Sequence, residues 1–234
     1  MALKIRAILS AVGAAVLVAA GAQAQTAYTI GNGGTSLIRF DVSNPSNATV
    51  VGSFGGAASS LDAIDFRPLN GRMYGYSDAT DSFYTVDLNT AQLTLASTGV
   101  AAAPTNTRRV GLDFNPTIDR ARLVTESDQN IVYNPNTGTV GAFTTLFYAA
   151  ADANAGVDPS VIENAYTNSF AGATTTQQYV IDHNLNTVAT LANNAGTLVT
   201  VGALGVDTGL ATGFDIFSAN GSNMAYAILT PDGS

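Results

Sequence analysis

Three aspartates at repeated positions are the residues of this sequence best suited to chemistry. Asp65, Asp113 and Asp215 each stand between two apolar residues in the same repeated motif. A group of such carboxylates could hold a cation such as Ca²⁺. Each could instead accept hydrogen bonds from a turn of its own repeat or of the next one. We favour hydrogen bonding, because an architectural role recurs in every repeat whereas a binding site usually does not.

A cluster of arginines, with acids between them, forms a second candidate. The arginines are Arg108, Arg109, Arg120 and Arg122, and the acids are Asp113 and Asp119. The guanidinium groups could bind an anion through their forked donors. They could equally form an ion-pair network between repeats. We favour the network, because the nearby acids can satisfy the arginines.

The segment Asp152–Asp158 places oxygen-bearing side chains at alternate positions. Asp152, Asn154 and Asp158 are spaced as in calcium-binding loops. The fifth position is occupied by Gly156 rather than by Asp or Asn. We therefore interpret the segment as a connector, with Ca²⁺ binding as the alternative.

The single histidine, His183, lies in a predicted turn at 182–186. No G-x-S-x-G motif accompanies it, and one histidine cannot build a histidine-based zinc site. The run Gly31–Gly34 indicates a turn. It is not a phosphate-binding loop, because it lacks the Lys-Ser/Thr of that motif. We accordingly assign no catalytic, cofactor-binding or metal-binding residue and expect no cofactor.

The N-terminal residues 1–24 have the pattern of a secretory signal peptide. Lys4 and Arg6 precede the mostly apolar run Ala7–Ala20, and Ala22-Gln23-Ala24 forms a small-x-small cleavage pattern. The alternative, a membrane anchor, is disfavoured because the apolar run is short for a bilayer span. We predict a secreted or periplasmic protein that begins at Gln25 and has no membrane span.

Residues 25–234 are predicted to form a single domain. They contain seven arginines, no lysine and 17 acids, which is a net charge of −10. This acidity argues against nucleic acid or anionic lipid as a partner. The chain has no cysteine, which excludes disulfides, thiolate catalysis and zinc–thiolate sites.

Two motifs recur along the chain. An apolar strand that ends in Asp or Asn before a turn is found at 37–41, 83–87, 130–134 and 178–182. Its terminal residues, Asp41, Asp87, Asn134 and Asp182, are spaced by 46, 47 and 48 residues. An apolar-Asp-apolar strand with a following apolar strand precedes the first motif, in stretches such as Ile64-Asp65-Phe66.

These motifs predict an all-β fold, a β-propeller of about five blades built from four-stranded antiparallel repeats of about 47 residues. The first unit lacks its first strand, units 61–99 and 109–147 are complete, and the last is incomplete. The fourth unit is irregular, with 165–168 as its second strand and 178–182 as its third. Strands from both termini could close a four- or five-bladed ring, and a β-sandwich is the alternative fold.

Long stretches resemble a family of exported bacterial proteins that is known only as a domain of unknown function. They include I-D-F-R-P-L-N-G-R-M-Y-G, G-L-D-F-N-P-T-I-D-R-A-R-L-V-T, Q-N-I-V-Y-N-P-N-T-G-T-V, A-Y-T-N-S-F-A-G-A-T-T-T, V-G-A-L-G-V-D and G-F-D-I. The resemblance covers nearly all of 25–234. Family members typically continue with a last strand pair of the type Y-T-I-N-L-x-T-G, which this sequence lacks. The resemblance implies a secreted propeller-like domain and no established activity.

We expect a non-enzymatic module that binds a ligand, protein or glycan, or serves a structural role. The alternative is a metal-dependent propeller hydrolase that uses carboxylates facing the axis. A third possibility is a shortened, non-functional relative, with an unpaired last strand as its weakness.

Overall fold

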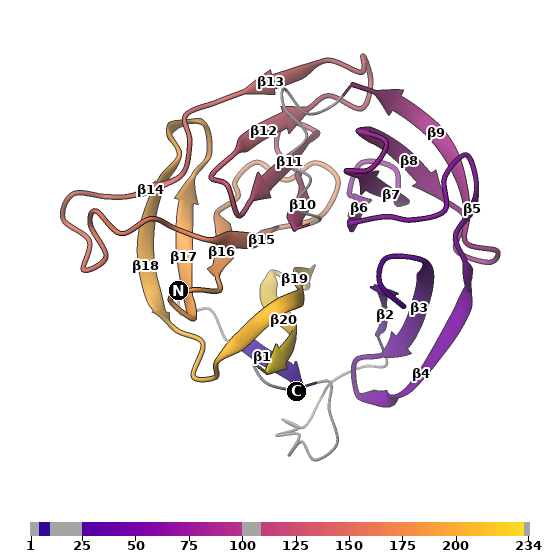
Figure 1. Ribbon diagram of the computed structural model, residues 1–234, viewed down its shortest axis with the longest axis horizontal. Coiled ribbons are helices and arrows are strands. Elements are labelled where there is room, and N and C mark those ends of the chain that lie inside the picture. The colour runs from indigo at the N-terminus through magenta and orange to yellow at the C-terminus, as the bar shows by residue number, and fades with distance from the viewer. Residues whose placement is uncertain (1–4, 10–24, 100–108, 232–234) are drawn as a thin grey trace.

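The computed structural model describes residues 5–9, 25–99 and 109–231, which form five small sheets around a common axis (Figure 1). Sheet 1 consists of β2 (Thr26–Gly31), β3 (Ser36–Asp41) and β4 (Asn44–Ser53). Sheet 2 consists of β5 (Gly55–Gly56), β6 (Ala63–Arg67), β7 (Arg72–Ser77), β8 (Ser82–Val86) and β9 (Gln92–Thr98). Sheet 3 consists of β10 (Val110–Asn115), β11 (Arg120–Thr125), β12 (Asn130–Tyr133) and β13 (Val140–Ala142).

The second half of the chain forms two more sheets. Sheet 4 consists of β14 (Phe147–Tyr148), β15 (Val161–Tyr166), β16 (Gln178–Asp182), β17 (Thr187–Ala192) and β18 (Thr197–Ala203). Sheet 5 consists of β1 (Ile5–Leu9), β19 (Thr208–Ala219) and β20 (Ser222–Pro231). Within the described ranges the only helix is the short 3₁₀ turn η1 (Asn193–Ala195). The fold is therefore all-β, as predicted, and none of the described residues forms a helix that could span a membrane.

The arrangement is a four-bladed β-propeller, with sheets 1 to 4 as the blades. Five blades, the count predicted from the repeats, are not supported. The reason is that the fifth unit contributes only the antiparallel hairpin β19–β20, which β1 joins in parallel. The radial sheets also differ from the two stacked layers of a sandwich (Figure 1). Most of the predicted signal peptide lies outside the described residues, and the backbone of its segment 5–9 is β1.

Sheet 4 departs from the strand assignment made from the sequence. Its order is β14-β18-β17-β16-β15, so β15 is nearest the axis and β16 is the second strand. The segment 178–182 was expected to be the third strand, and 165–168 the second. The assignment failed because β16 keeps the sequence motif of a third strand but follows β15 after a long connection at residues 167–177.

The repeated Asp or Asn at the end of a strand closes the turn that follows it. Side-chain oxygens of Asp41 and Asn134 accept hydrogen bonds from backbone amides two residues ahead. Asp87 accepts from the amides of both Asn89 and Thr90, and Asp182 accepts from the amide of Leu185. Such local bonds explain why this residue recurs with the repeat.

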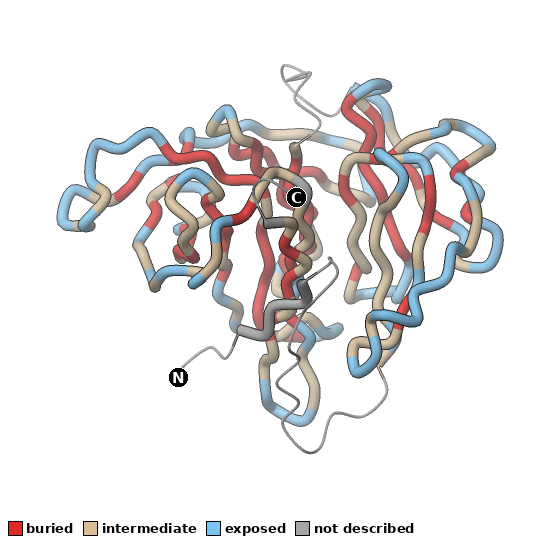
Figure 2. Tube along the Cα trace, turned by 60° about the horizontal axis from the view of Figure 1, so that its bottom comes forward, coloured by how far each residue is buried: buried red, intermediate tan, exposed pale blue. Residues whose placement is uncertain are grey.

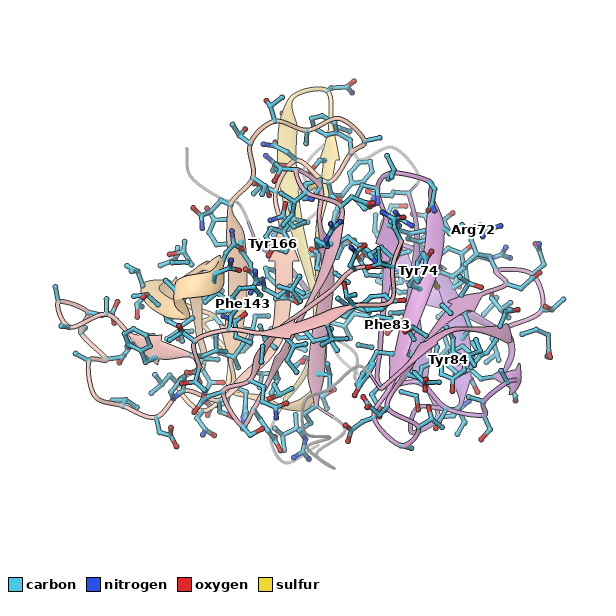
Figure 3. All side chains as sticks on the ribbon, turned by 90° about the horizontal axis from the view of Figure 1, so that it is seen from above. Arg72, Tyr74, Phe83, Tyr84, Phe143 and Tyr166 are labelled. Atoms are coloured by element: carbon cyan, nitrogen blue, oxygen red, sulfur yellow. The ribbon has the colours of Figure 1, made fainter. Side chains whose placement is uncertain are left out.

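Neighbouring sheets bury their apolar faces against one another in four separate cores. These lie between sheets 1 and 2, 2 and 3, 3 and 4, and 4 and 5, where buried segments are concentrated (Figure 2). In the second of them, the rings of Phe83 and Tyr133 stack with centroids 4.1 Å apart. Tyr74 and Phe83 both come from sheet 2 (Figure 3). Among the described residues no such core joins sheet 5 to sheet 1.

The close approach of the strands nearest the axis requires a glycine at one position. A Cβ atom added to Gly111 of β10 would lie 2.6 Å from the Cα atom of Glu163 in β15. Any other residue would therefore collide with the neighbouring backbone. Glycine here lets sheets 3 and 4 pack together at the axis.

Phe83→Ala is expected to lower the free energy of unfolding by about 3–5 kcal/mol, because Phe83 is fully buried between two blades. Leu95→Ala, on β9 of the same sheet, is the matched control, because Leu95 is half exposed. It should change stability by less than about 0.5 kcal/mol. Chemical denaturation measures both, and equal losses would contradict the burial of Phe83 as the source of the effect.

Candidate functional site

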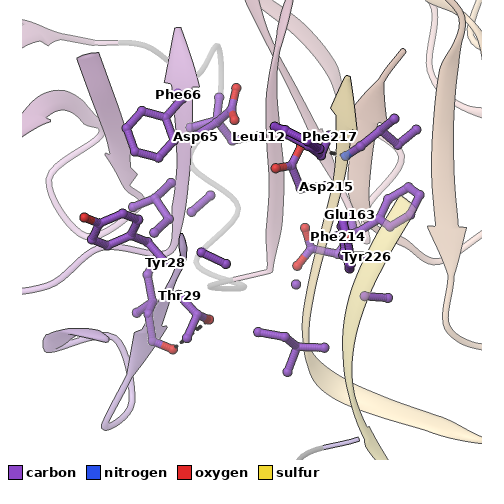
Figure 4. A pocket seen from close by; sticks show the side chains of 18 of the residues that line it. Tyr28, Thr29, Asp65, Phe66, Leu112, Glu163, Phe214, Asp215, Phe217 and Tyr226 are labelled. Atoms are coloured by element: carbon purple, nitrogen blue, oxygen red, sulfur yellow. Dashed lines mark hydrogen bonds between the residues drawn. The ribbon is translucent and has the colours of Figure 1, made fainter. Parts of the chain in front are cut away.

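A cavity of about 430 Å³ occupies the region where sheet 5 and sheet 1 have no shared core. Strands β2 and β6 line it on one side and β19 and β20 on the other (Figure 4). Its aromatic residues are Tyr28, Phe40, Phe66, Phe214, Phe217 and Tyr226. Its acidic residues are Asp62, Asp65, Glu163 and Asp215. Apolar walls with a few converging polar groups are typical of ligand-binding cavities.

The repeated aspartates lie on the strands nearest the axis and connect one blade to the next. Asp65 of β6 accepts a hydrogen bond at 2.9 Å from the backbone amide of Phe114 in β10. Asp113 of β10 accepts one in the same way from the amide of Tyr166 in β15. These amides belong to a different sheet from the acceptor, and no strand pairs with that edge. The favoured hydrogen-bonding interpretation is therefore confirmed for Asp65 and Asp113.

The carboxyl groups of Asp65 and Asp113 also interact with each other. Burial, with the negative charge of Asp215 nearby, raises the pKa of Asp65 to about 7. Burial and the charges of Asp65 and Asp215 raise the pKa of Asp113 well above its usual value. Burial and mutual repulsion disfavour the simultaneous ionisation of neighbouring carboxyl groups.

Asp215 differs from these two in its partners. Its side chain is surrounded by protein yet accessible from the cavity, and burial raises its pKa. Its Oδ1 accepts a hydrogen bond at 2.6 Å from the amide of the next residue in the same strand, Ile216. Glu163 contacts the Thr212 hydroxyl at 3.2 Å, and burial raises the pKa of Glu163 well above its usual value.

The donor set does not favour a metal centre. Asp65 and Asp113 each use a carboxylate oxygen for a backbone amide, and burial raises the pKa of both, which disfavours the ionised form that a metal ion requires. Within residues 5–9, 25–99 and 109–231, no three His, Cys, Asp or Glu side chains are arranged to hold a metal ion. The carboxylates that the hydrolase alternative would use interact electrostatically with one another.

The structure disperses the arginine cluster. Asp119 does form an ion pair between blades, but with Arg67 of the preceding blade rather than with an arginine of the cluster. Arg109 pairs with Glu126 at 3.2 Å, and Arg120 donates to backbone carbonyls. Arg108 lies outside the described residues. No anion-binding patch forms from the arginines that are described.

Arg122 is buried and uses neutral partners. Its Nε donates to the Tyr166 hydroxyl at 3.0 Å, and its terminal nitrogens donate to Asn130 and Asn194. Its guanidinium carbon lies 5.8 Å from the centre of the Phe143 ring. Arg122 thus joins sheet 3 to sheet 4 rather than facing solvent.

The segment 152–158 serves as a connector. Both carboxylate oxygens of Asp152 are used to hold Thr200 of β18, through its amide at 2.6 Å and its hydroxyl at 2.8 Å. Asn154 donates to the same hydroxyl at 2.9 Å. His183 is half-buried in the turn between β16 and β17 and does not line the cavity. Gly31–Gly34 forms the turn between β2 and β3, as expected.

Sequence reasoning identified Asp65 and Asp215 but missed the aromatic residues beside them. Tyr28, Phe66 and Phe217 are common residue types in strands, and no local motif distinguishes them. One signal was present, since the first repeat has no first strand. Because sheet 1 begins with β2, the edge of β2 and the inner face beside it have no covering strand among the described residues.

Residues 36–234 match the family described as "Domain of unknown function (DUF4394)". No curated protein matches this chain.

Several solved structures are similar to this chain. A structural genomics protein of unknown function from Bacteroides thetaiotaomicron VPI-5482 is 16% identical, with a TM-score of 0.52 over 76% of this chain and 44% of that one. An auxiliary nutrient binding protein from the same organism is 14% identical, with a TM-score of 0.44 over 71% and 44%. The structure "YCF48 bound to D1 peptide" is 12% identical, with a TM-score of 0.46 over 86% and 57%. This chain thus spans about half the length of these proteins, and the likeness concerns the fold alone.

Asp65→Asn is expected to stabilise the protein at pH 8, by on the order of 1–3 kcal/mol, and to lose this advantage near pH 4. The folded carboxyl, with its pKa of about 7, binds its proton more tightly than the unfolded chain does. Its contribution to stability is therefore present at low pH and is lost as the pH rises from about 4 to 7. Asparagine keeps an acceptor for the Phe114 amide.

Urea denaturation at several pH values measures this dependence. Asp207→Asn is the control, because Asp207 is an exposed acid outside the cavity. It should show no comparable gain at pH 8. A constant difference between Asp65→Asn and the parent from pH 4 to pH 8 would contradict the raised pKa.

Proposed function

Because this chain belongs to the DUF4394 family of domains of unknown function, we propose its role from the site itself: it is a non-enzymatic binding module. The ligand, a protein segment or a glycan, occupies the cavity between β2 and β19. One observation carries this proposal. Four pairs of neighbouring sheets are joined by apolar cores, whereas the space between sheet 5 and sheet 1 holds a cavity lined by aromatic and carboxyl side chains.

The electrostatics of the cavity support a binding role. The surrounding protein raises the pKa values of Asp65, Glu163 and Asp215, and all three carboxyl groups line the cavity. Groups of this kind are concentrated at functional sites. Near neutral pH, partly protonated carboxyls can both donate and accept hydrogen bonds, which suits amide or hydroxyl groups of a ligand.

The aromatic residues supply the apolar part of the binding surface. Phe217 lines the cavity while 40% of its surface is exposed, so it contributes little to the protein's own core. Tyr28 lies edge-on to Phe66 with ring centroids 5.8 Å apart, and both face the cavity. Partly exposed aromatic side chains are frequent binding determinants because they bury a large area at small entropic cost.

We also propose that the protein is exported and acts in the periplasm or outside the cell. The basic residues, apolar run and A-x-A pattern of residues 1–24 support this. The absence of cysteine and the net charge of −10 for residues 25–234 are compatible with it.

N-terminal sequencing of the protein recovered from the periplasm or the medium is expected to find Gln25 first. Signal peptidase cleaves after the second small residue of the A-x-A pattern, which is Ala24. Recovery of a chain that still begins at Met1 would overturn the export proposal.

Phe217→Ala is expected to weaken ligand binding about tenfold, because a half-buried ring contributes about 1–2 kcal/mol to an apolar contact. The probes are an octapeptide library and a panel of oligosaccharides. Binding is measured as a rise in Tm and as a change in tyrosine emission, since the chain has no tryptophan.

Phe170→Ala is the matched control, because Phe170 is 49% exposed and lies outside the cavity. It should bind as the parent does. Each titration is repeated with Ca²⁺ and with EDTA. Binding that survives Phe217→Ala would refute the site, and binding abolished by EDTA would favour the metal-dependent hydrolase instead.

A further inference from the structure

The cavity lies where the first blade lacks a strand. An offset of 46 residues aligns β2 with β7 of the second blade, so that Tyr28 corresponds to Tyr74. In sheet 2, Tyr74 of β7 pairs with Asp65 of the first strand, β6. Sheet 5 repeats this pair as Tyr226 with Asp215. Tyr28 has no corresponding aspartate strand among the described residues, because sheet 1 begins with β2.

The free edge of β2 presents backbone groups toward this gap. The amide of Val42 donates to the carbonyl of Gln25 at 3.0 Å, and that of Thr35 donates to Gly31 at 3.1 Å. These bonds direct the backbone groups of the odd-numbered residues of β2 toward β3. In an antiparallel strand, those of Thr26, Tyr28 and Ile30 then point to the opposite edge. Each offers one N–H and one C=O group.

The neighbours of the cavity are those that a first strand has elsewhere in the ring. In sheet 3, the first strand β10 pairs with β11 and packs between β6 and β15. The cavity is lined likewise by β2, by β6 of the following blade and by β19 of the preceding sheet. A strand placed here would complete both the sheet and the ring.

Asp215 provides a second, independent indication. Asp65 and Asp113 each accept the amide of the residue that follows the aspartate in the next first strand. Asp215 has the same place in β19, but the described residues contain no first strand beyond it, and its Oδ1 accepts the amide of Ile216 in its own strand. Its carboxyl is therefore set to receive an amide from an inserted strand.

We propose that the cavity accepts an extended segment of a partner protein, which pairs antiparallel with β2 as the missing first strand of the first blade. This inference rests on the proposed binding function and specifies its ligand. The chain's own first strands supply the pattern, apolar-Asp-apolar, as in Ala63–Arg67. The aspartate of the segment lies opposite Tyr28, and the amide of the residue after it reaches Asp215. Addition of a strand to an exposed sheet edge is a common mode of peptide recognition.

The acidic lining is compatible with such a segment. Asp65 and Asp113 already lie close together at the axis, where burial and neighbouring negative charges raise the pKa values of both. A further aspartate beside Asp65 and Asp215 would meet the same conditions, which favour its protonated form.

The probe is a fluorescent peptide with the sequence of residues 61–68, Leu-Asp-Ala-Ile-Asp-Phe-Arg-Pro, and anisotropy with the full chain measures binding. Saturable binding is expected. N-methylation of the amide at the Asp65 position removes the bond to the Tyr28 carbonyl and should weaken binding at least tenfold. N-methylation at the Ile64 position is the matched control, because that amide points away from β2. It should change affinity by less than about twofold.

A substitution in the protein tests the other contact. Asp215→Ala is expected to weaken peptide binding about tenfold, whereas Asp207→Ala should have no effect. Equal effects of the two N-methylations would overturn the proposed register. If the chain forms a dimer and the peptide dissociates it, the strand is supplied by a second copy of this chain and not by a different partner protein. Oligosaccharide binding that depends on Phe217, without any peptide binding, would overturn strand insertion and leave the binding function standing. Absence of both would overturn both.

Discussion

Sheets 2, 3 and 4 each have two apolar faces, and a neighbouring sheet covers each of them. This constraint explains the ring, the repeat and the site together. Four interfaces satisfy it with buried cores, in which aromatic residues such as Phe83 and Tyr133 stack across the boundary. No such core lies between sheets 5 and 1 in the described part of the chain, because sheet 1 begins with its second strand and the fifth unit contributes only the hairpin β19–β20. An uncovered interface of this kind must be lined by side chains that tolerate water or a ligand.

The carboxyl groups at the axis solve a related problem. Strands nearest the axis expose an edge with no pairing partner, so their amides need acceptors from elsewhere. Asp65 and Asp113 provide these acceptors across blade boundaries, at the cost of burying carboxyl groups beside one another. The same arrangement leaves Asp215 without a neighbouring strand to bind. Equivalent residues therefore serve both the architecture and the candidate function. Asp65 and Asp113 bind the next blade, whereas Asp215 faces the cavity.

The sequence predicted the local features well. The Asp or Asn that ends a strand binds amides two or three residues away, so its spacing alone revealed the turns at Asp41, Asp87, Asn134 and Asp182. It predicted the fourth blade poorly, because β16 carries a third-strand motif in second-strand position. The pairing of β15 with β16 spans a long connection, and its register depends on packing that no local motif encodes.

The sequence by itself determined that the chain is an all-β repeat protein, because strand alternation and turn-closing residues act over a few neighbouring positions. It also identified Asp65, Asp113 and Asp215 as equivalent. Only the tertiary structure decided their roles. The amide that Asp65 binds lies 49 residues away, and the amide bound by Asp113 lies 53 residues away. Asp215 borders a cavity, so within the described ranges its carboxyl accepts no amide from a following blade. These outcomes follow from how the sheets close around the axis, which is a property of the assembled ring rather than of any single repeat.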